Sequence, residues 1–287
     1  MKGIILAAGA GTRLSPATFP ISKILLPIYD RPMIYYPLST LMMAGIRDIL
    51  VITNEADLHN FKRTLGDGSQ FGVNIQYKIQ YIQRGISDAF LIGEDFIAGE
   101  SVCLILGDNI FYSPMLDSIL DSVSEHKDGA IVFGYKVPDP ERFGVVEFDE
   151  NMRVISLEEK PEHPKSNYAV VGIYFYDGKV SDMAKQLKPS DRGELEITDL
   201  NKLYLEEGNL NVKLFDDEMK WIDAGTFASL LESSQFIAEK ENELGKKILC
   251  PEIVAYEKTF ITKDQLSSWI KKNKDNDYFK QAGSIQE

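Results

Sequence analysis

The sequence predicts an α/β fold, in which a mixed, mostly parallel sheet is flanked by helices and followed by a helical C-terminal tail. Two observations lead to this prediction. Short apolar segments rich in Ile and Val alternate with stretches whose apolar residues recur at helical spacing. Glycines follow those stretches, where helices commonly end. Alternation of strand and helix is typical of a parallel sheet that helices cover on both faces.

The first half contains most of this alternation. Strands are expected at residues 4–8, 49–53, 75–80 and 102–106. Helices are expected at residues 32–44, 57–65 and 87–98, followed by Gly45, Gly66 and Gly99. In sheets of this kind, ligands bind beyond the carboxyl ends of the strands. The residues that directly follow each strand are therefore the first candidates for a functional site.

The second half has strand-like segments with fewer helices between them. Strands are expected at residues 130–135, 145–148, 154–158, 168–176 and 210–215, and helices at 226–244 and 264–273. No linker rich in Pro, Gly or Ser separates the halves. We therefore expect one domain at residues 1–240, with a first half at about 1–130 and a second at about 131–225, and a helical tail at residues 241–287.

Composition excludes several classes of protein. The chain has 287 residues and a net charge of −13, whereas nucleic-acid binders need a basic surface. No apolar run is long enough for a membrane span, and the N-terminus lacks the pattern of a signal peptide. Cys103 and Cys250 have no metal-type spacing, and the three histidines share no motif. We expect a cytoplasmic protein that binds neither nucleic acid nor a membrane.

The first expected strand leads directly into a glycine loop, Gly-Ala-Gly-Thr-Arg-Leu at residues 9–14. Small residues let backbone N–H groups approach a phosphate chain closely. Leu14 stands where the dinucleotide fingerprint needs a small residue, and the Walker sequence is absent. Arg13 and Lys23 beside such a loop suit a triphosphate. On spacing alone, a helix-capping Arg13 and a solvated Lys23 are equally compatible with the sequence.

Two carboxylates follow apolar segments. Asp108 follows the fourth expected strand after Gly107, and Asp223 stands in the segment Trp-Ile-Asp-Ala-Gly-Thr at residues 221–226. A carboxylate at the carboxyl end of a strand stands where a metal-bound phosphate would lie. The structural alternative is an Asp that begins a turn or caps a helix. Spacing in the sequence does not decide whether the two carboxylates meet.

Taken together, the motifs resemble those of the sugar-nucleotidyltransferases. The shared segments are LAAGAGTRL (6–14), SKILLP (22–27), GDN (107–109), GVVEF (144–148), EEKP (158–161) and WIDAGT (221–226). Three further segments resemble the thymidylyltransferase branch of that family: MIYYPL (33–38), SNYAV (166–170) and RGELEITD (192–199). The resemblance covers nearly the whole chain. It implies a Rossmann-like, GT-A-like nucleotidyltransferase fold, with a nucleotide-binding first half and a sugar-binding second half.

The resemblance also implies roles for individual residues. The nucleotide would be bound by Ala8, Gly9, Gly11, Thr12, Arg13, Lys23, Gln80, Gly85 and Asp108. The sugar phosphate would be bound by Asn109, Gly144, Glu159, Lys160, Val170, Tyr174, Arg192 and Trp221. Asp108 and Asp223 would hold Mg²⁺, and together with Arg13 and Lys23 they would form the catalytic set.

The implied reaction joins dTTP to glucose 1-phosphate and releases pyrophosphate, the first step towards dTDP-rhamnose and other deoxysugars. A phosphate monoester is already an anion near neutral pH, so the attack needs no general base. Two alternatives remain: the same chemistry with UTP, and a silent relative that binds nucleotide sugars without catalysis. The resemblance further implies a homotetramer and feedback inhibition by a downstream deoxysugar nucleotide.

The sequence departs from the family pattern around the expected base site. Between Gln80 and Ala89 the family commonly carries prolines and an acidic residue before the glycine. Here residues 81–88 read Tyr-Ile-Gln-Arg-Gly-Ile-Ser-Asp. Ala8 also replaces a usual glycine, which leaves the phosphate loop intact.

Overall fold

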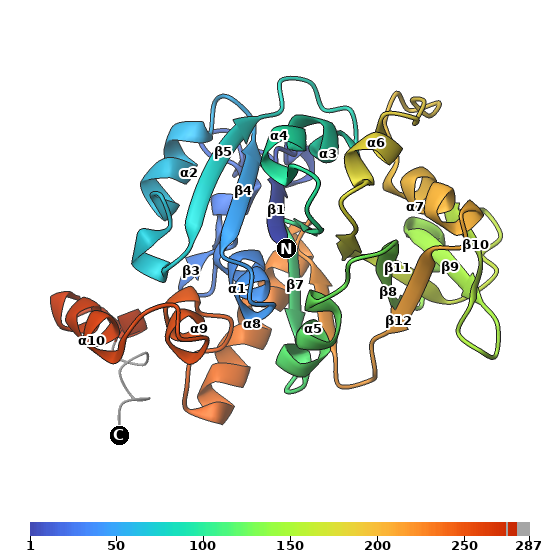
Figure 1. Ribbon diagram of the computed structural model, residues 1–287. Coiled ribbons are helices and arrows are strands. Elements are labelled where there is room, and N and C mark those ends of the chain that lie inside the picture. Colours follow the sequence, from blue (N-terminus) through green and yellow to red (C-terminus); the bar gives the residue numbers. More distant parts are fainter. Residues whose placement is uncertain (274, 280–287) are drawn as a thin grey trace.

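A nine-stranded sheet forms the centre of the molecule (Figure 1). The computed structural model describes residues 1–273 and 275–279. Seven strands follow the order β10-β9-β11-β6-β1-β4-β5, and β8 and β12 extend the sheet from β11. Their bounds are β1 Lys2–Ala7, β4 Asp48–Thr53, β5 Asn74–Ile79, β6 Val102–Leu106, β8 Ala130–Lys136, β9 Gly144–Phe148, β10 Val154–Glu159, β11 Tyr168–Tyr176 and β12 Leu210–Leu214.

The direction of the strands changes at β11. Strands β6, β1, β4 and β5 are all parallel, whereas β11 pairs antiparallel with β6, β8 and β9. Strand β12 returns parallel to β8. The register of β11 against β8 shifts between Val170 and Tyr174, so the strand is irregular where it passes the end of β6. The predicted mixed α/β sheet is confirmed.

Helices cover both faces of the sheet. Neighbouring strand residues point to opposite sides, and here both sides carry apolar side chains that the helices bury. Ile4, Leu50 and Leu104 pack in one core cluster, and Ile5 and Val51 pack in the other. The first cluster also holds residues of α3 (Asp88–Ile92), α4 (Glu94–Ile97), α6 (Val180–Ala184) and α7 (Ile197–Glu206). The second also holds residues of α1 (Tyr35–Met43), α2 (Leu58–Leu65), α5 (Leu116–Ser124), α8 (Phe227–Leu244), α9 (Pro251–Glu257) and α10 (Lys263–Lys272).

Two expectations about helices need correction. The single helix expected at residues 87–98 is two short helices, α3 and α4, that meet at Gly93. A Cβ atom at Gly93 would lie 2.9 Å from Ala89 O and 3.2 Å from Ile4 Cδ1, so the glycine lets this turn pack against β1. The second half, where fewer helices were expected, has α6 and α7 between its strands, and the sequence placed neither of them. Their Ser, Asp, Asn and Thr residues weaken the helical signal.

The C-terminal tail is tied to the N-terminal half by buried ion pairs. The hairpin of β2 (Pro27–Ile28) and β3 (Arg31–Pro32) presents Arg31, whose side chain is only 1% exposed, to Glu241 of α8. Lys247 Nζ lies 2.8 Å from the other oxygen of Glu241 and also contacts Asp30. Removing one member of such a network leaves an uncompensated buried charge. The tail therefore belongs to the same folded unit as β3.

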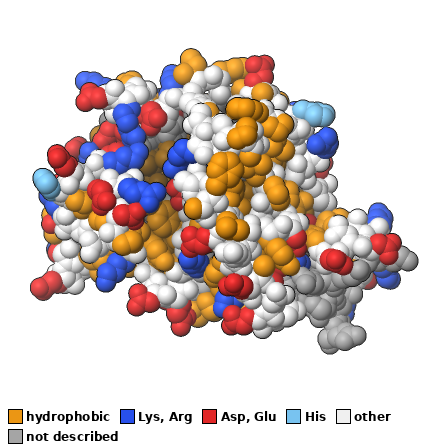
Figure 2. Space-filling view, turned by 180° about the vertical axis from the view of Figure 1, so that it is seen from behind, with side chains coloured by type: hydrophobic (Ala, Val, Ile, Leu, Met, Phe, Trp, Pro, Cys, Tyr) orange, Lys and Arg blue, Asp and Glu red, His pale blue; other side chains and the backbone are white. Residues whose placement is uncertain are grey.

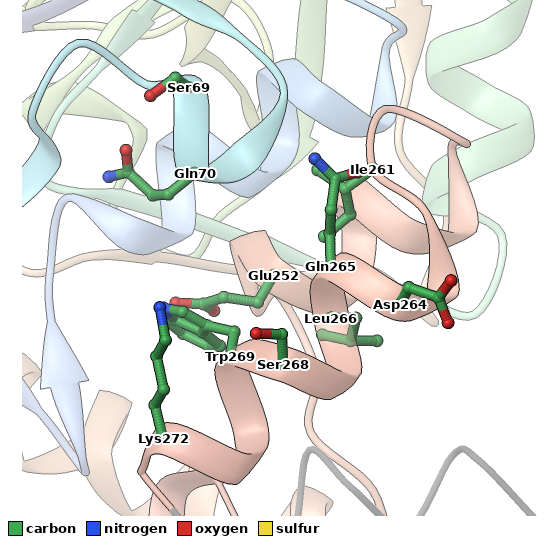
Figure 3. A pocket seen from close by; sticks show the side chains of 10 residues that line it. All are labelled: Ser69, Gln70, Glu252, Ile261, Asp264, Gln265, Leu266, Ser268, Trp269 and Lys272. Atoms are coloured by element: carbon green, nitrogen blue, oxygen red, sulfur yellow. The ribbon is translucent and has the colours of Figure 1, made fainter.

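The outer part of the tail encloses a cavity of about 380 Å³ between α10 and residues 69–70 (Figure 3). Glu252 of α9 lies at its wall with Trp269 and Lys272. Glu252 Oε2 accepts a hydrogen bond from Tyr278 Oη at 2.6 Å, whereas Oε1 is buried without a partner among the described residues. Burial raises the pKa of Glu252 above its usual 4.5.

Among the described helices, none combines the length and the apolar character that crossing a bilayer requires.

The buried carboxyl of Glu252 should make stability depend on pH. Because its pKa is raised in the folded state, its contribution to stability is present below about pH 4.5 and is lost as the pH rises above that value. Glu252→Gln removes the titration, so the melting temperature of the variant minus that of the parent chain should increase by a few degrees between pH 5 and pH 8. Glu239→Gln, at an exposed position of α8, is the control. A difference that stays constant with pH would contradict the prediction.

Candidate active site

The glycine loop begins where β1 ends. Gly11 has φ 63°, a left-handed conformation that favours glycine, and it starts a short 3₁₀ turn at Thr12–Leu14. Thr18 Oγ1 donates to Gly11 O at 3.0 Å, which fixes the turn. A Cβ atom at Gly9 would lie 3.6 Å from Lys23 Cε, so the loop and this lysine are neighbours. The loop therefore presents backbone N–H groups beside a cation, an arrangement that suits phosphate.

Lys23 reaches the end of the neighbouring strand. It opens a second 3₁₀ turn, Lys23–Leu25, whose cap is the side chain of Ser22. Its Nζ donates to the carboxylate of Asp108, and both side chains are only 14% exposed. Asp108 follows β6, which pairs directly with β1. The adjacent carboxyl ends of two parallel strands thus place the loop, the lysine and the carboxylate together.

A separate two-stranded sheet brings Asp223 to this place. Strands β7 (Asn109–Tyr112) and β13 (Lys220–Asp223) pair antiparallel, with Asp223 opposite Asn109. Ala224 N then donates to Asp108 O at 2.9 Å. Burial and the neighbouring Asp108 carboxylate raise the pKa of Asp223, while Lys23, Arg13 and Arg142 act in the opposite direction. The two carboxylates that the sequence analysis could not place together are electrostatic neighbours.

Arg13 completes this group. A Cβ atom at Gly225 would lie 2.7 Å from Arg13 Nη2 and 3.1 Å from Asp223 Oδ1. The missing side chain therefore gives room for the guanidinium beside the carboxylate. Arg13, Asp108 and Asp223 line one cavity, of about 300 Å³. Lys23 is therefore not the solvated charge that its spacing also allowed, whereas Arg13 is an exposed residue that lines the cavity.

All eight residues expected at the sugar phosphate line the same cavity: Asn109, Gly144, Glu159, Lys160, Val170, Tyr174, Arg192 and Trp221. Val170 and Tyr174 of β11 both line the cavity, on either side of the point where the register of the strand shifts. Gly172 lies between them, and a Cβ atom there would approach Asn109 Oδ1 to 2.6 Å. The irregular part of β11 is therefore the floor of the cavity.

A network of acidic and basic side chains surrounds the C-terminal end of β10. Thr198 Oγ1 donates to Glu159 Oε2 at 2.6 Å, close to the backbone of Gly144. Arg192 Nη2 lies 2.9 Å from Glu196 Oε2 and 3.3 Å from Glu159 Oε1. Lys160 follows at φ 45°, with Nζ 3.7 Å from Glu159 and the side chain 49% exposed. Both cations are held by carboxylates yet remain accessible to an anion.

Trp221 is positioned by Asn109. Its Nε1 donates to Asn109 Oδ1 at 2.7 Å, and Gly172 N donates to the same oxygen at 3.3 Å. Asn109 Nδ2 in turn donates to Asp108 Oδ1 at 3.1 Å. The Trp221 ring packs edge-on against Phe143, with ring centroids 5.3 Å apart. One buried amide therefore links the Asp108 carboxylate to an aromatic wall of the cavity.

Gln80 and Gly85 lie outside this cavity, on a loop that borders the glycine loop. Gln83 Nε2 donates to Ala8 O at 2.8 Å, which joins the two loops. Gly85 has φ 96°, and a Cβ atom there would lie 2.5 Å from Leu195 O. Ala8, Gly9, Gly11, Thr12 and Lys23 also lie outside the cavity lining. The expected nucleotide residues thus form a second region that meets the first at Arg13 and Asp108.

The site offers two carboxylates to a divalent cation. Among the described residues, no group of three or more His, Cys, Asp and Glu side chains could hold a metal by itself. Mg²⁺ commonly takes one or two protein carboxylates and completes its shell with substrate phosphate and water. Asp108 and Asp223 fit that demand, because a cation would compensate the burial and the repulsion from Asp108 that together raise the pKa of Asp223.

Sequence reasoning missed several residues of the cavity: Ile86, Arg142, Phe143, Gly172, Glu196 and Thr198. Arg142 is the most informative of them, because it acts electrostatically on Asp223. It stands two residues before the Gly-Val-Val-Glu-Phe segment, so its position near that motif was the available signal. Figure 2 shows Lys, Arg, Asp and Glu side chains gathered around a hollow in the surface, away from the tail.

Known proteins resemble this chain over most of its length. A glucose-1-phosphate thymidylyltransferase of Neisseria meningitidis is 52% identical over 97% of this chain and 96% of its own, and one of Mycobacterium tuberculosis is 52% identical over 93% and 92%. A solved structure of UDP-glucose pyrophosphorylase with UDP-glucose covers 83% of this chain and 98% of its own, with a TM-score of 0.72 and 26% identity.

A solved structure from Bacillus anthracis, provisionally called glucose-1-phosphate thymidylyltransferase, covers 82% of this chain and 94% of its own, with a TM-score of 0.76 and 44% identity. The sequence pattern of the nucleotidyl transferases matches residues 2–240, which include β1, the glycine loop and both carboxylates. Sequence, fold and arrangement of the site agree, and the chain belongs to the nucleotidyl transferase family.

Proposed function

We propose that the chain is a magnesium-dependent glucose-1-phosphate thymidylyltransferase, which converts dTTP and α-D-glucose 1-phosphate to dTDP-glucose and pyrophosphate. The proposal rests on one observation: the β7–β13 pairing holds Asp108 and Asp223 together beside Arg13 and Lys23. The names of the relatives support this choice of substrates. The product would enter dTDP-rhamnose and deoxysugar synthesis.

The proposed roles divide between the halves at residues 1–130 and 131–225. The glycine loop would wrap the triphosphate, with Ala8, Gly9, Gly11 and Thr12 giving close backbone approach and Lys23 a point charge. Gln80 and Gly85 would contact the base. The sugar ring and its phosphate would occupy the cavity of about 300 Å³, with Arg192 and Lys160 at the phosphate. Residues 241–287 would form a tail outside the catalytic chemistry.

The reaction would proceed by in-line attack. An oxygen of the sugar phosphate forms a bond to the α-phosphorus, the bond from that phosphorus to the bridging oxygen breaks, and pyrophosphate leaves with the electron pair. Arg13 and Lys23 neutralise the charge that otherwise repels two anions. Mg²⁺, when bound by Asp108 and Asp223, supplies further neutralisation and orients the α-phosphate. The remaining task of the protein is positioning, to which rigid strand ends are suited.

One assay tests this function. Pyrophosphate release is measured with glucose 1-phosphate and each of dTTP, UTP, dCTP and GTP, with and without Mg²⁺. We expect the highest kcat/KM with dTTP and loss of turnover without the metal. Preference for UTP would favour the alternative enzyme, to which the likeness with UDP-glucose pyrophosphorylase points. Binding of nucleotide sugar without any turnover would identify a silent relative and contradict the proposal.

Asp108 and Asp223 should act as one unit. Asp108→Asn and Asp223→Asn each keep the shape but remove a charge that holds the cation, so each should lower kcat at least about 100-fold. The double variant should be little worse than the worse single variant, because the residues share one task. Asp182→Asn, at an exposed carboxylate, is the control. Losses that simply multiply would indicate two independent roles.

Lys160 should serve the sugar phosphate and not the nucleotide. A charge-assisted contact to phosphate contributes enough that Lys160→Met should raise KM for glucose 1-phosphate roughly 10-fold or more. KM for dTTP should change less than about twofold. Lys165→Met is a matched control, since Lys165 is 51% exposed and pairs with Glu158. An equal rise in KM for glucose 1-phosphate and for dTTP would assign Lys160 a structural role.

We propose in addition that the chain works in the cytoplasm as a homotetramer. The assembly is supported by large apolar side chains exposed near α8. Phe227 and Leu231 lie one turn apart at 52% and 60% exposure, and Tyr29, which the same helix contacts, is 41% exposed. A contiguous exposed apolar patch is typical of a protein–protein interface. Light scattering that gives the mass of a single chain, 32.4 kDa, would contradict the assembly.

A further inference from the structure

The side-chain amide of Gln80 is held at one end. Gln80 directly follows β5, its backbone N donates to Thr53 O at 2.8 Å, and its side chain is nearly buried. Nε2 donates to Asp88 Oδ2 at 3.0 Å and more weakly to Gly85 O at 3.5 Å. An amide can present either its oxygen or its nitrogen to a ligand, and these contacts decide which.

Asp88 determines whether the Gln80 amide presents its oxygen or its nitrogen to a ligand. It is the first residue of α3, is 1% exposed, and pairs through Oδ1 with Arg84 Nη2 at 2.7 Å. An ionised carboxylate accepts hydrogen bonds and donates none. Asp88 therefore turns Nε2 of Gln80 towards itself. No group among the described residues donates a hydrogen bond to Oε1, and Oε1 is not one of the buried polar atoms that lack a partner, so it is open to solvent.

The loop that carries these residues is fixed on both sides. Gln83 joins it to Ala8 of the glycine loop, and Leu195 N donates to Arg84 O at 2.6 Å. Ser87 Oγ donates to Glu196 O at 3.1 Å. Because these three contacts, two of them through side chains of the loop, hold it in place, the loop has little freedom to reorient the amide when a ligand arrives. The free Oε1 is therefore a preorganised acceptor.

We propose that Asp88 is a positioning residue that sets which base the nucleotide site accepts. By orienting Gln80, it presents an acceptor to the N3–H group of thymine or uracil. Cytosine has an acceptor at N3, so two lone pairs would face each other without a proton. A site built around one buried hydrogen bond rejects the partner that cannot complete it. This inference rests on the proposed function, since it needs a pyrimidine nucleotide beside Gln80.

The decisive variant is Asp88→Asn. An Asn side chain has one acceptor oxygen, which Arg84 would occupy, and its amide nitrogen would then face Gln80. Gln80 would turn over, placing Nε2 towards the base. We expect the ratio of kcat/KM for dTTP to that for dCTP to fall about 10-fold or more, and the ratio of the two dissociation constants, measured by calorimetry, to change in the same direction.

Two further variants separate orientation from general damage. Arg84→Gln removes the other partner of Asp88 but leaves it an acceptor, so the dTTP to dCTP ratio should stay within about twofold of the parent value. Adding Gln80→Glu to Asp88→Asn should restore the ratio even if absolute rates fall, because a carboxylate at position 80 offers only acceptors.

The outcomes are distinguishable from failure of the proposed function. If the parent chain does not turn over any pyrimidine nucleotide, the function is wrong and the inference has no base to act on. Suppose that the parent prefers dTTP but Asp88→Asn lowers kcat/KM for dTTP and dCTP by the same factor, or changes neither value. Asp88 then has only a structural role and the inference is overturned. A change in the ratio that Gln80→Glu reverses would be unexplained by a structural role.

Discussion

The pairing of β7 with β13 is the contact on which the rest of the site depends. Asp108 and Asp223 lie on segments that are far apart in the chain, and the main sheet alone would not bring them together. The register that sets Asp223 opposite Asn109 does so, with Ala224 N bonded to Asp108 O. Trp221 comes from the same strand, so one short ladder positions both a carboxylate and an aromatic wall.

Gathering like charges in a half-buried site is unfavourable, and the surroundings offset that cost. Asp223 has a raised pKa because it is buried beside Asp108. Lys23 contacts Asp108 directly, and Gly225 leaves room for Arg13 near Asp223. The cations that would oppose triphosphate repulsion therefore also stabilise the free site. In the free protein, Lys23 pairs with Asp108. A bound metal would have to share the Asp108 carboxylate, and a bound phosphate would have to share Lys23.

Residue patterns predicted the parallel half of the sheet well because hydrophobic periodicity is a local property. Strand β6 was predicted at its observed bounds, and β1, β4 and β5 within two residues at each end. Local patterns did not reveal that the helix expected at residues 87–98 breaks at Gly93, because that break depends on packing against Ile4. They also did not predict the pairing of strands that are distant in the sequence, such as β7 and β13.

The site was predictable to the extent that motifs carry it. All eight residues assigned to the sugar phosphate by resemblance line a single cavity. Arg142 escaped notice because its effect on Asp223 depends on distance in space and on no pattern of its own. The resemblance assigned Gln80 to the nucleotide but did not reveal that its amide nitrogen donates to Asp88. That partner lies in the segment that departs from the family pattern, where resemblance carries least information.

The buried ion pairs between β3 and the tail have a consequence for synthesis of the chain. Arg31 leaves the ribosome early, but its partner Glu241 follows 210 positions later. Until then only the Asp30 carboxylate, 3.7 Å from Arg31 Nε, offers the guanidinium an opposite charge, and burial of the hairpin of β2 and β3 stays unfavourable. A nascent chain that already contains β1 to β12 can therefore assemble most of the sheet but not close this side of the core. Completion of the fold is delayed until α8 and Lys247 have been made.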